Sequence, residues 1–124
     1  MLVDLKVKNF VLIDELEINF KKGLNVLTGE TGAGKSIIIG ALDMLLGSRA
    51  SSDIIRKGEE VAYIEAAYEP QELEKINNIL ENSGIEPDSD ILLLSREIKR
   101  NGRNRSRING QLATLNMIRN ISRY

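Results

Sequence analysis

The stretch Gly29-Glu30-Thr31-Gly32-Ala33-Gly34-Lys35-Ser36 decides the fold class of this chain. It matches the phosphate-binding loop G-x-x-x-x-G-K-[ST], whose glycines let successive backbone N–H groups point inward around an anion. Lys35 is expected to reach the β- and γ-phosphates, and the Ser36 hydroxyl to complete the shell of a Mg²⁺ ion. Glu30 and Thr31 are expected to act through their backbone N–H groups. The stretch therefore predicts a site for a nucleoside triphosphate.

The residues on both sides of this loop provide the strand-loop-helix context that the motif requires. Residues 24–28 have the composition of a short buried strand, and residues 37–46 predict a helix that ends at Gly47. This helix is apolar nearly all round, which is typical of a helix packed between sheets. A chance glycine-rich turn would show the same letters without the function, but here motif and context coincide.

The composition limits the other chemistry that the chain can perform. Its 124 residues, of which 42% are hydrophobic, suit one globular domain. It contains no cysteine, which excludes disulfides and thiolate metal sites, and no histidine, which excludes an imidazole base or zinc ligand. No apolar stretch approaches the roughly 20 residues of a membrane span, and the first residues do not resemble a signal peptide. We therefore expect a cytoplasmic protein with no membrane partner.

The net charge of −1 conceals a segregation of charge along the chain. The middle third is acidic, with Glu59, Glu60, Glu65, Glu69, Glu72, Glu74 and Glu81. A short later stretch is basic, with Arg96, Lys99, Arg100, Arg103, Arg105 and Arg107.

Hydrophobic spacing predicts the remaining elements. Alternation predicts two half-buried strands around residues 3–8 and 15–20, which we expect to pair antiparallel. Residues 48–58 predict a loop, either plain or with a short helical turn, and 61–68 a further strand. A helix that starts at Pro70 and ends at Gly84 follows.

The last third of the chain predicts a hairpin and a helix. Strands over 91–99 and 104–108 flank Asn101-Gly102, a strong hairpin signal, and Asn109-Gly110 closes the second strand. Apolar residues from Leu112 to Ile121 at helical spacing then predict a final helix capped by Thr114.

Several motifs together resemble the start of an SMC-type ATPase head, a relative of the ABC transporter ATPases that acts on DNA. The strand ending in Lys8-Asn9-Phe10 is followed by a second strand and by Gly-Leu-Asn-Val-Leu-Thr before the phosphate loop. The match continues, in order and spacing, through residues 45–50, 55–58, 95–98 and 102–111. Within this group the chain is most similar to ATPases of bacterial double-strand-break repair and recombination.

This resemblance implies ATP and Mg²⁺ as ligands, duplex or single-stranded DNA as a partner of the whole protein, and association with the nucleoid. It also implies that residues 1–124 are the N-terminal lobe of a split head. In this family a distant C-terminal lobe, beyond a coiled coil, carries the signature motif and the catalytic glutamate, and two heads sandwich ATP. We therefore expect no catalytic residue here and little or no ATP turnover by this chain alone.

Two sets of arginines are further candidates. Arg56 matches an SMC-head arginine that reaches the nucleotide phosphates, so it is a candidate arginine finger, with Arg49 as a weaker one. Equally, Arg56 could be a solvated residue that pairs with Glu59 or Glu60. In the basic hairpin, Arg100, Arg103, Arg105 and Arg107 are candidate DNA contacts. No aromatic residue interleaves them, so contact would be with phosphates and indifferent to sequence. The alternatives are a solvated edge hairpin and a hairpin paired with the acidic helix around Glu72 and Glu74.

Two other P-loop classes remain open as alternatives. A small-molecule kinase has a similar loop and buried helix, but it usually begins at the strand before the loop. An ABC transporter ATPase subunit is expected to carry an aromatic adenine platform, for which Phe10 could be mistaken. The expected fold is α/β of the P-loop NTPase class: a mixed sheet and a small antiparallel sheet around the buried helix. In the absence of a second lobe, strand edges and apolar surface should be exposed.

Overall fold

The computed structural model describes residues 2–11, 13–19, 32–48, 52–87 and 90–122, with residues 32–37 and 52 described by their backbone alone. Its elements are β1 (Leu2–Phe10), β2 (Ile13–Asn19), α1 (Gly32–Leu45), the 3₁₀ turn η1 (Ser52–Ile54), β3 (Val61–Tyr68), α2 (Leu73–Asn82), β4 (Leu92–Lys99), β5 (Asn104–Ile108), β6 (Gln111–Ala113) and α3 (Leu115–Ile121). The strands form one six-stranded sheet in the order β2-β1-β3-β4-β5-β6, and all of these pairings are antiparallel.

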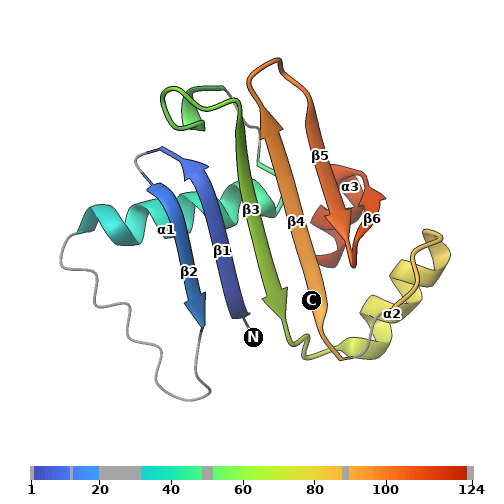
Figure 1. Ribbon diagram of the computed structural model, residues 1–124. Helices are drawn as coiled ribbons and strands as arrows, with labels where there is room; N and C mark the ends of the chain where they lie inside the picture. Colours follow the sequence, from blue (N-terminus) through green and yellow to red (C-terminus); the bar gives the residue numbers. More distant parts are fainter. Residues whose placement is uncertain (1, 12, 20–31, 49–51, 88–89, 123–124) are drawn as a thin grey trace.

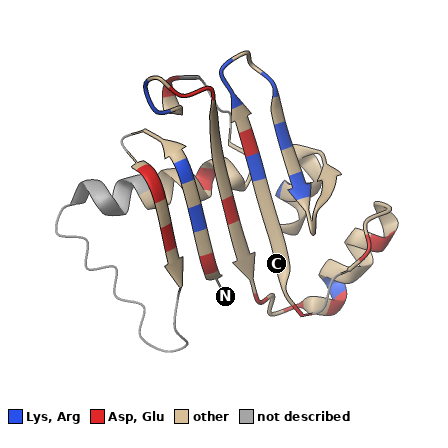
Figure 2. Ribbon diagram, in the orientation of Figure 1, with Lys and Arg blue, Asp and Glu red and all other residues tan. Residues whose placement is uncertain are grey.

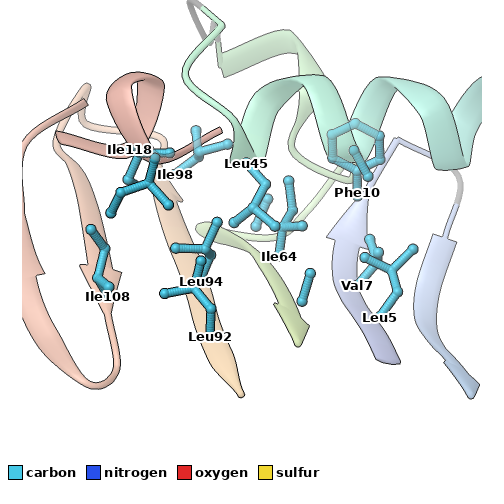
Figure 3. Close-up of a cluster of buried hydrophobic side chains, with 14 of the residues drawn as sticks. Leu5, Val7, Phe10, Leu45, Ile64, Leu92, Leu94, Ile98, Ile108 and Ile118 are labelled. Atoms are coloured by element: carbon cyan, nitrogen blue, oxygen red, sulfur yellow. The ribbon is translucent and has the colours of Figure 1, made fainter. Parts of the chain in front are cut away.

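Helices α1 and α3 lie on one face of the sheet, whereas α2 lies at one end of β3 and β4 (Figure 1). The covered face carries every second residue of the central strands, because successive side chains of a strand point to opposite faces. Figure 3 shows Leu45 of α1 and Ile118 of α3 directed at this apolar layer. The fully buried residues of the layer include Leu5, Val7, Ala62, Ile64, Leu94, Ile98 and Ile108.

The opposite face of the sheet is charged and open. Acidic residues on β2 and β3 flank basic residues on β1, and basic residues on β5 lie beside Glu97 of β4 (Figure 2). Lys6, for example, stands between Glu17 of β2 and Glu65 of β3 in the strand register. Cross-strand pairs of opposite charge stabilise a solvated sheet face modestly.

Most of the predicted elements are confirmed. The strands over 61–68 and 104–108 have the predicted bounds, β1 and β2 pair antiparallel, and α1 ends just before Gly47. Strand β6 was not predicted: Leu112, which was counted with the final helix by its spacing, lies in β6, and α3 begins at Leu115. Three residues are too few to show an alternation. The predicted start of α2 at Pro70 was wrong. The helix begins at Leu73, and Pro70 lines an apolar groove with Ile76 and Ile121.

The fold class is confirmed as α/β, with α1 against an antiparallel sheet. The expected pair of sheets, one mixed and one small and antiparallel, is not what the described strands form: they make a single antiparallel sheet. Residues 24–28, expected as a strand, lie outside the described residues. The expected exposure of apolar surface is present: Ile39 on α1 is 57% exposed and Leu112 on β6 is 65% exposed. Strands β2 and β6 are the edges of the sheet among the described strands. Within the described parts of the chain, no helix has the length and apolar character needed to span a membrane.

Candidate functional site

The predicted phosphate loop lies at the start of α1, and the structure describes its second half. Gly29, Glu30 and Thr31 lie outside the described residues. The backbone from Gly32 to Ser36 is helical and opens α1, which therefore begins five residues earlier than the predicted position 37. The first N–H groups of a helix have no acceptor within the helix, and the helix dipole places partial positive charge there. The backbone of residues 32–36 is thus placed as an anion site requires.

The other end of α1 is held by an unusually complete set of hydrogen bonds. Gly47 has φ +111°, its N–H donates to the Met44 carbonyl at 3.3 Å, and the Ser48 N–H donates to the Asp43 carbonyl at 3.1 Å. This pair of bonds is a Schellman motif, which satisfies the last carbonyls of a helix. The predicted helix stop at Gly47 is therefore confirmed, and the residue must be glycine for the reversal of the chain.

Two arginines add to this end of the helix from different elements. Arg96 of β4 donates from Nη1 to the carbonyls of Met44, at 2.5 Å, and Ser48, at 2.6 Å. Arg119 of α3 donates from Nη2 and Nε to the Gly47 carbonyl, at 2.6 and 3.2 Å. Positive side chains at a helix C-terminus oppose the negative end of the helix dipole. The two guanidinium groups thus bind α1 to the sheet and to α3.

Arg96 is the largest fully buried side chain of the described residues, at 1% exposure. Its Nε has no hydrogen-bond partner within the described part of the chain. Burial, and secondarily the Arg119 guanidinium, lower the pKa of Arg96. Arg96 was grouped by sequence with the basic residues that end at Arg107, but the structure separates it from them by burying it. The sequence signal that reveals this burial is strand alternation: Arg96 is two residues from both Leu94 and Ile98, so it lies on the covered face with them.

Arg56, the candidate arginine finger, lies on a segment, residues 54–60, that is fixed to the turn after β1. The Val11 N–H donates to the Ile54 carbonyl at 2.7 Å, and the Arg56 N–H donates to the Asn9 carbonyl at 2.8 Å. Asn9 and Val11 have φ of +54° and +52°, which is strained for a β-branched residue such as valine. The docked segment is therefore held at the expense of local backbone strain.

The side chain of Arg56 pairs with a residue that sequence analysis did not consider. Its Nη1 lies 3.4 Å from Oδ1 of Asp14 on β2, and its side chain is 40% exposed. Among the described residues, no ion pair joins Arg56 to Glu59 or Glu60. Because Asp14 is exposed and the Arg56 side chain is partly exposed, the pair with Asp14 contributes little stability and leaves the guanidinium partly accessible. Arg49 lies outside the described residues.

Arg100 joins the 54–60 segment to the basic hairpin. Its backbone N–H donates to the Glu60 carbonyl, and its side chain donates to the carbonyls of Glu59 at 2.9 Å and Arg56 at 3.3 Å. Arg100 therefore holds the 54–60 segment against the hairpin, in addition to contributing positive charge at the surface.

The other three basic hairpin candidates differ in their partners. Arg103 and Arg105 are exposed, at the tip and on the open face of β5, where Figure 2 shows basic residues gathered at one corner of the sheet. Arg107 lies on the same face as Arg105, as predicted, but its Nη1 is 2.8 Å from Oε1 of Glu97. Arg103 and Arg105 are therefore better placed for a phosphate than Arg107.

Comparison with known proteins identifies the family. The model of the AAA domain matches residues 4–122. The DNA repair protein RecN of Bacillus subtilis is 41% identical over 123 residues, which are 99% of this chain and 21% of RecN. RecN of Halalkalibacterium halodurans is 45% identical over 121 residues, 98% of this chain and 21% of that protein. The chain thus spans about a fifth of the length of the curated relatives it matches.

A solved structure agrees with the sequence relatives. The structure of an SMC ATPase, from work on its ATP-driven dimerization and DNA-stimulated activation, has a TM-score of 0.73 and 27% identity to this chain. The likeness covers 97% of this chain and 76% of that one. The SMC-type resemblance of the sequence is thereby confirmed in three dimensions. The chain therefore belongs to the AAA domain family, and within that family its sequence is similar to the bacterial DNA repair proteins called RecN.

Proposed function

We propose that this chain is the ATP-binding lobe of a RecN-like ATPase that acts in DNA double-strand-break repair and recombination. One observation carries the proposal: the phosphate-loop motif at 29–36 runs into the N-terminus of α1, in a chain similar to RecN and SMC heads over nearly all its length. This likeness favours the SMC type over a kinase or a transporter subunit. The lobe assignment for residues 1–124 belongs to the same proposal.

Residues Gly29 to Ser36 would hold the triphosphate of ATP. Backbone N–H groups of the loop and of the first turn of α1 would bind the phosphate oxygens, and Lys35 would supply the positive charge for the β- and γ-phosphates. The Ser36 hydroxyl would be one ligand of Mg²⁺, which neutralises phosphate charge when it is bound. The helical backbone that begins at Gly32 fits this role because the free N–H groups of its first turn lie at the positive end of the α1 dipole.

Arg56 would approach the nucleotide from the 54–60 segment. Two backbone hydrogen bonds, at Ile54 and Arg56, help to fix this segment, while the partner of the guanidinium among the described residues is the exposed carboxylate of Asp14. An anchored backbone with an exchangeable side chain suits a group that changes partner when a phosphate arrives. We assign it a supporting role, because water activation would come from a lobe outside this chain and turnover would require a second head, in a homodimer.

Arg103 and Arg105 would contact DNA phosphates, with Arg100 and Arg107 beside them. Such contacts are electrostatic, so binding to duplex DNA should weaken steeply between low and physiological salt. Replacement of both Arg103 and Arg105 by Gln should reduce the affinity and flatten this salt dependence. Affinity that is unchanged by salt, or by the double substitution, would exclude these phosphate contacts. The protein would work in the cytoplasm, on the nucleoid.

Equilibrium titration with a fluorescent ATP analogue and Mg²⁺ tests the central proposal. The chain should bind the analogue, and Lys35→Ala should weaken binding at least tenfold without a change in folding measured by circular dichroism. Lys75→Ala on α2, which removes an exposed lysine outside the motif, is the matched control and should bind normally. A phosphate-release assay should show no sustained turnover by the chain alone. Binding that is equal in the Lys35 and Lys75 variants would sink the proposal.

A further inference from the structure

We propose that Arg96 and Arg119 form a clamp that positions the phosphate-loop helix and couples α3 to the nucleotide site. The inference rests on the proposed ATP function of residues 29–36. It concerns residues that lie at the opposite end of α1 from the phosphate loop. Neither arginine would touch nucleotide, so both are positioning residues.

The clamp supplies more than a helix end requires. The Schellman bonds from Gly47 and Ser48 already satisfy the carbonyls of Met44 and Asp43. Arg96 nevertheless adds a second donor to the Met44 carbonyl and one to Ser48, and Arg119 adds two to Gly47. Hydrogen bonds from a guanidinium are stronger than those between neutral groups. The end of α1 is therefore fixed to β4 and to α3 by separate charged contacts.

Arg96 is an expensive way to stabilise the end of α1. A guanidinium at 1% exposure with no ion pair among the described residues gives up its hydration on folding, and this cost offsets part of what its hydrogen bonds contribute. The contact is specific in a way that apolar packing is not, because it requires the carbonyls of residues 44 and 48 at fixed positions. The charge thus defines where α1 sits along the sheet.

A helix transmits such a constraint to its other end. Helix α1 has 14 residues, so its two ends are about 20 Å apart and are joined by one rigid element. Displacement of its C-terminal turn therefore displaces the residues of the phosphate loop at 32–36. Positioning errors of about 1 Å at a binding site are enough to lower affinity or rate substantially.

Arg119 makes α3 part of this mechanism. An added Cβ at Gly47 would lie 2.8 Å from Cγ of Arg119, so the α3 side chain lies directly against the reversal of the chain at the end of α1. Movement of α3 must break this contact or carry the end of α1 with it. By linkage the converse holds: nucleotide bound at one end of α1 should stabilise the contacts of α3 at the other.

Hydrogen exchange tests the coupling in the wild-type chain without any substitution. Saturating Mg²⁺ and ATP should slow exchange of the α3 amides more than exchange of the α2 amides, which lie at the end of the sheet and serve as the internal control. Equal slowing in both helices, or none in α3, overturns the inference.

Variants of Arg119 provide the second test, because this residue is largely exposed and its loss spares the core. Arg119→Met should weaken binding of the fluorescent ATP analogue about five- to tenfold and abolish the selective slowing in α3. Arg119→Lys, which can still donate to the Gly47 carbonyl, should recover part of both. Lys75→Met, the same change at an exposed position on α2, should alter neither.

The outcomes separate this inference from the proposed function. Wild-type affinity in Arg119→Met, with normal Lys35-dependent binding, overturns the clamp and leaves ATP binding intact. Absence of any Lys35-dependent binding in the wild-type chain overturns both. Loss of folding in Arg119→Met would leave the wild-type exchange experiment and Arg119→Lys to decide.

Discussion

Replacement of Arg96 by methionine should destabilise the chain by about 2–3 kcal/mol. Two hydrogen bonds from a charged donor, to Met44 and Ser48, would be lost, at about 1.5–3 kcal/mol each. Part of this loss is offset, because a buried guanidinium gives up several kcal/mol of hydration that methionine does not need. The Met44 carbonyl also keeps its bond from Gly47. The remainder is the predicted net effect.

Urea unfolding followed by circular dichroism measures this effect. The midpoint should fall with little change in the m-value, because a single buried contact changes stability and not the area exposed on unfolding. Arg96→Lys should lose less, since one ammonium can still donate to one carbonyl. Lys75→Met, which removes the exposed pair with Glu72, should stay within about 0.5 kcal/mol of the wild type. An Arg96→Met free energy of unfolding equal to that of Lys75→Met would refute the reasoning.

Three further predictions concern single contacts. Gly47→Ala should lower the free energy of unfolding in urea by about 1–3 kcal/mol, because Gly47 has a φ of +111°. The loss should exceed that of Gly58→Ala, since Gly58 also has a positive φ but no neighbour within 4 Å. Equal losses in the two variants would contradict a close contact between residue 47 and Arg119. Thr114→Ala should cost about 1 kcal/mol, because Oγ1 of Thr114 accepts from the Met117 N–H at 3.2 Å; Thr114→Ser should restore it, and a silent Thr114→Ala would argue against the cap. Burial raises the pKa of Tyr68 to about 12. Between the ordinary tyrosine pKa near 10 and this value, unfolding releases a proton from the phenol. The contribution of Tyr68 to the free energy of unfolding should therefore be fully present below pH 10 and fall by up to roughly 2 kcal/mol as the pH rises towards 12. Tyr68→Phe should flatten this fall, and an unchanged pH profile in that variant would exclude Tyr68 as its source.

Local sequence signals predicted most elements because their causes are local. Alternation gave the bounds of β3 and β5, and Gly47 and Thr114 marked a helix end and a helix start through backbone conformation and capping. The hairpin turns followed for the same reason: Gly102 and Gly110 have positive φ, as turns of this kind require. These features depend on residues within one turn of each other.

The errors have equally physical causes. Pro70 fits the first turn of a helix, but in the structure it lines the apolar groove at the end of the sheet, and the helix begins at Leu73. Arg96 was grouped with the hairpin arginines by proximity in sequence, although strand alternation separates it from them. Its neighbours Arg105 and Arg107 lie on the open face, whereas Arg96 lies on the covered one.

The sequence by itself determined the chemistry of this protein: the phosphate-loop motif, the absence of cysteine and histidine, and the SMC-type resemblance all follow from the order of residue types. Only the tertiary structure decided which charged side chains are exposed to a ligand and which are bound within the protein. It pairs Arg107 with Glu97, fixes Arg100 to backbone carbonyls and places Arg96 and Arg119 on the end of α1. The physical reason is the separation, along the chain, of the residues that interact. A motif is read from neighbours along the chain, whereas Arg96 meets its acceptors across 48 and 52 positions, which no local pattern records.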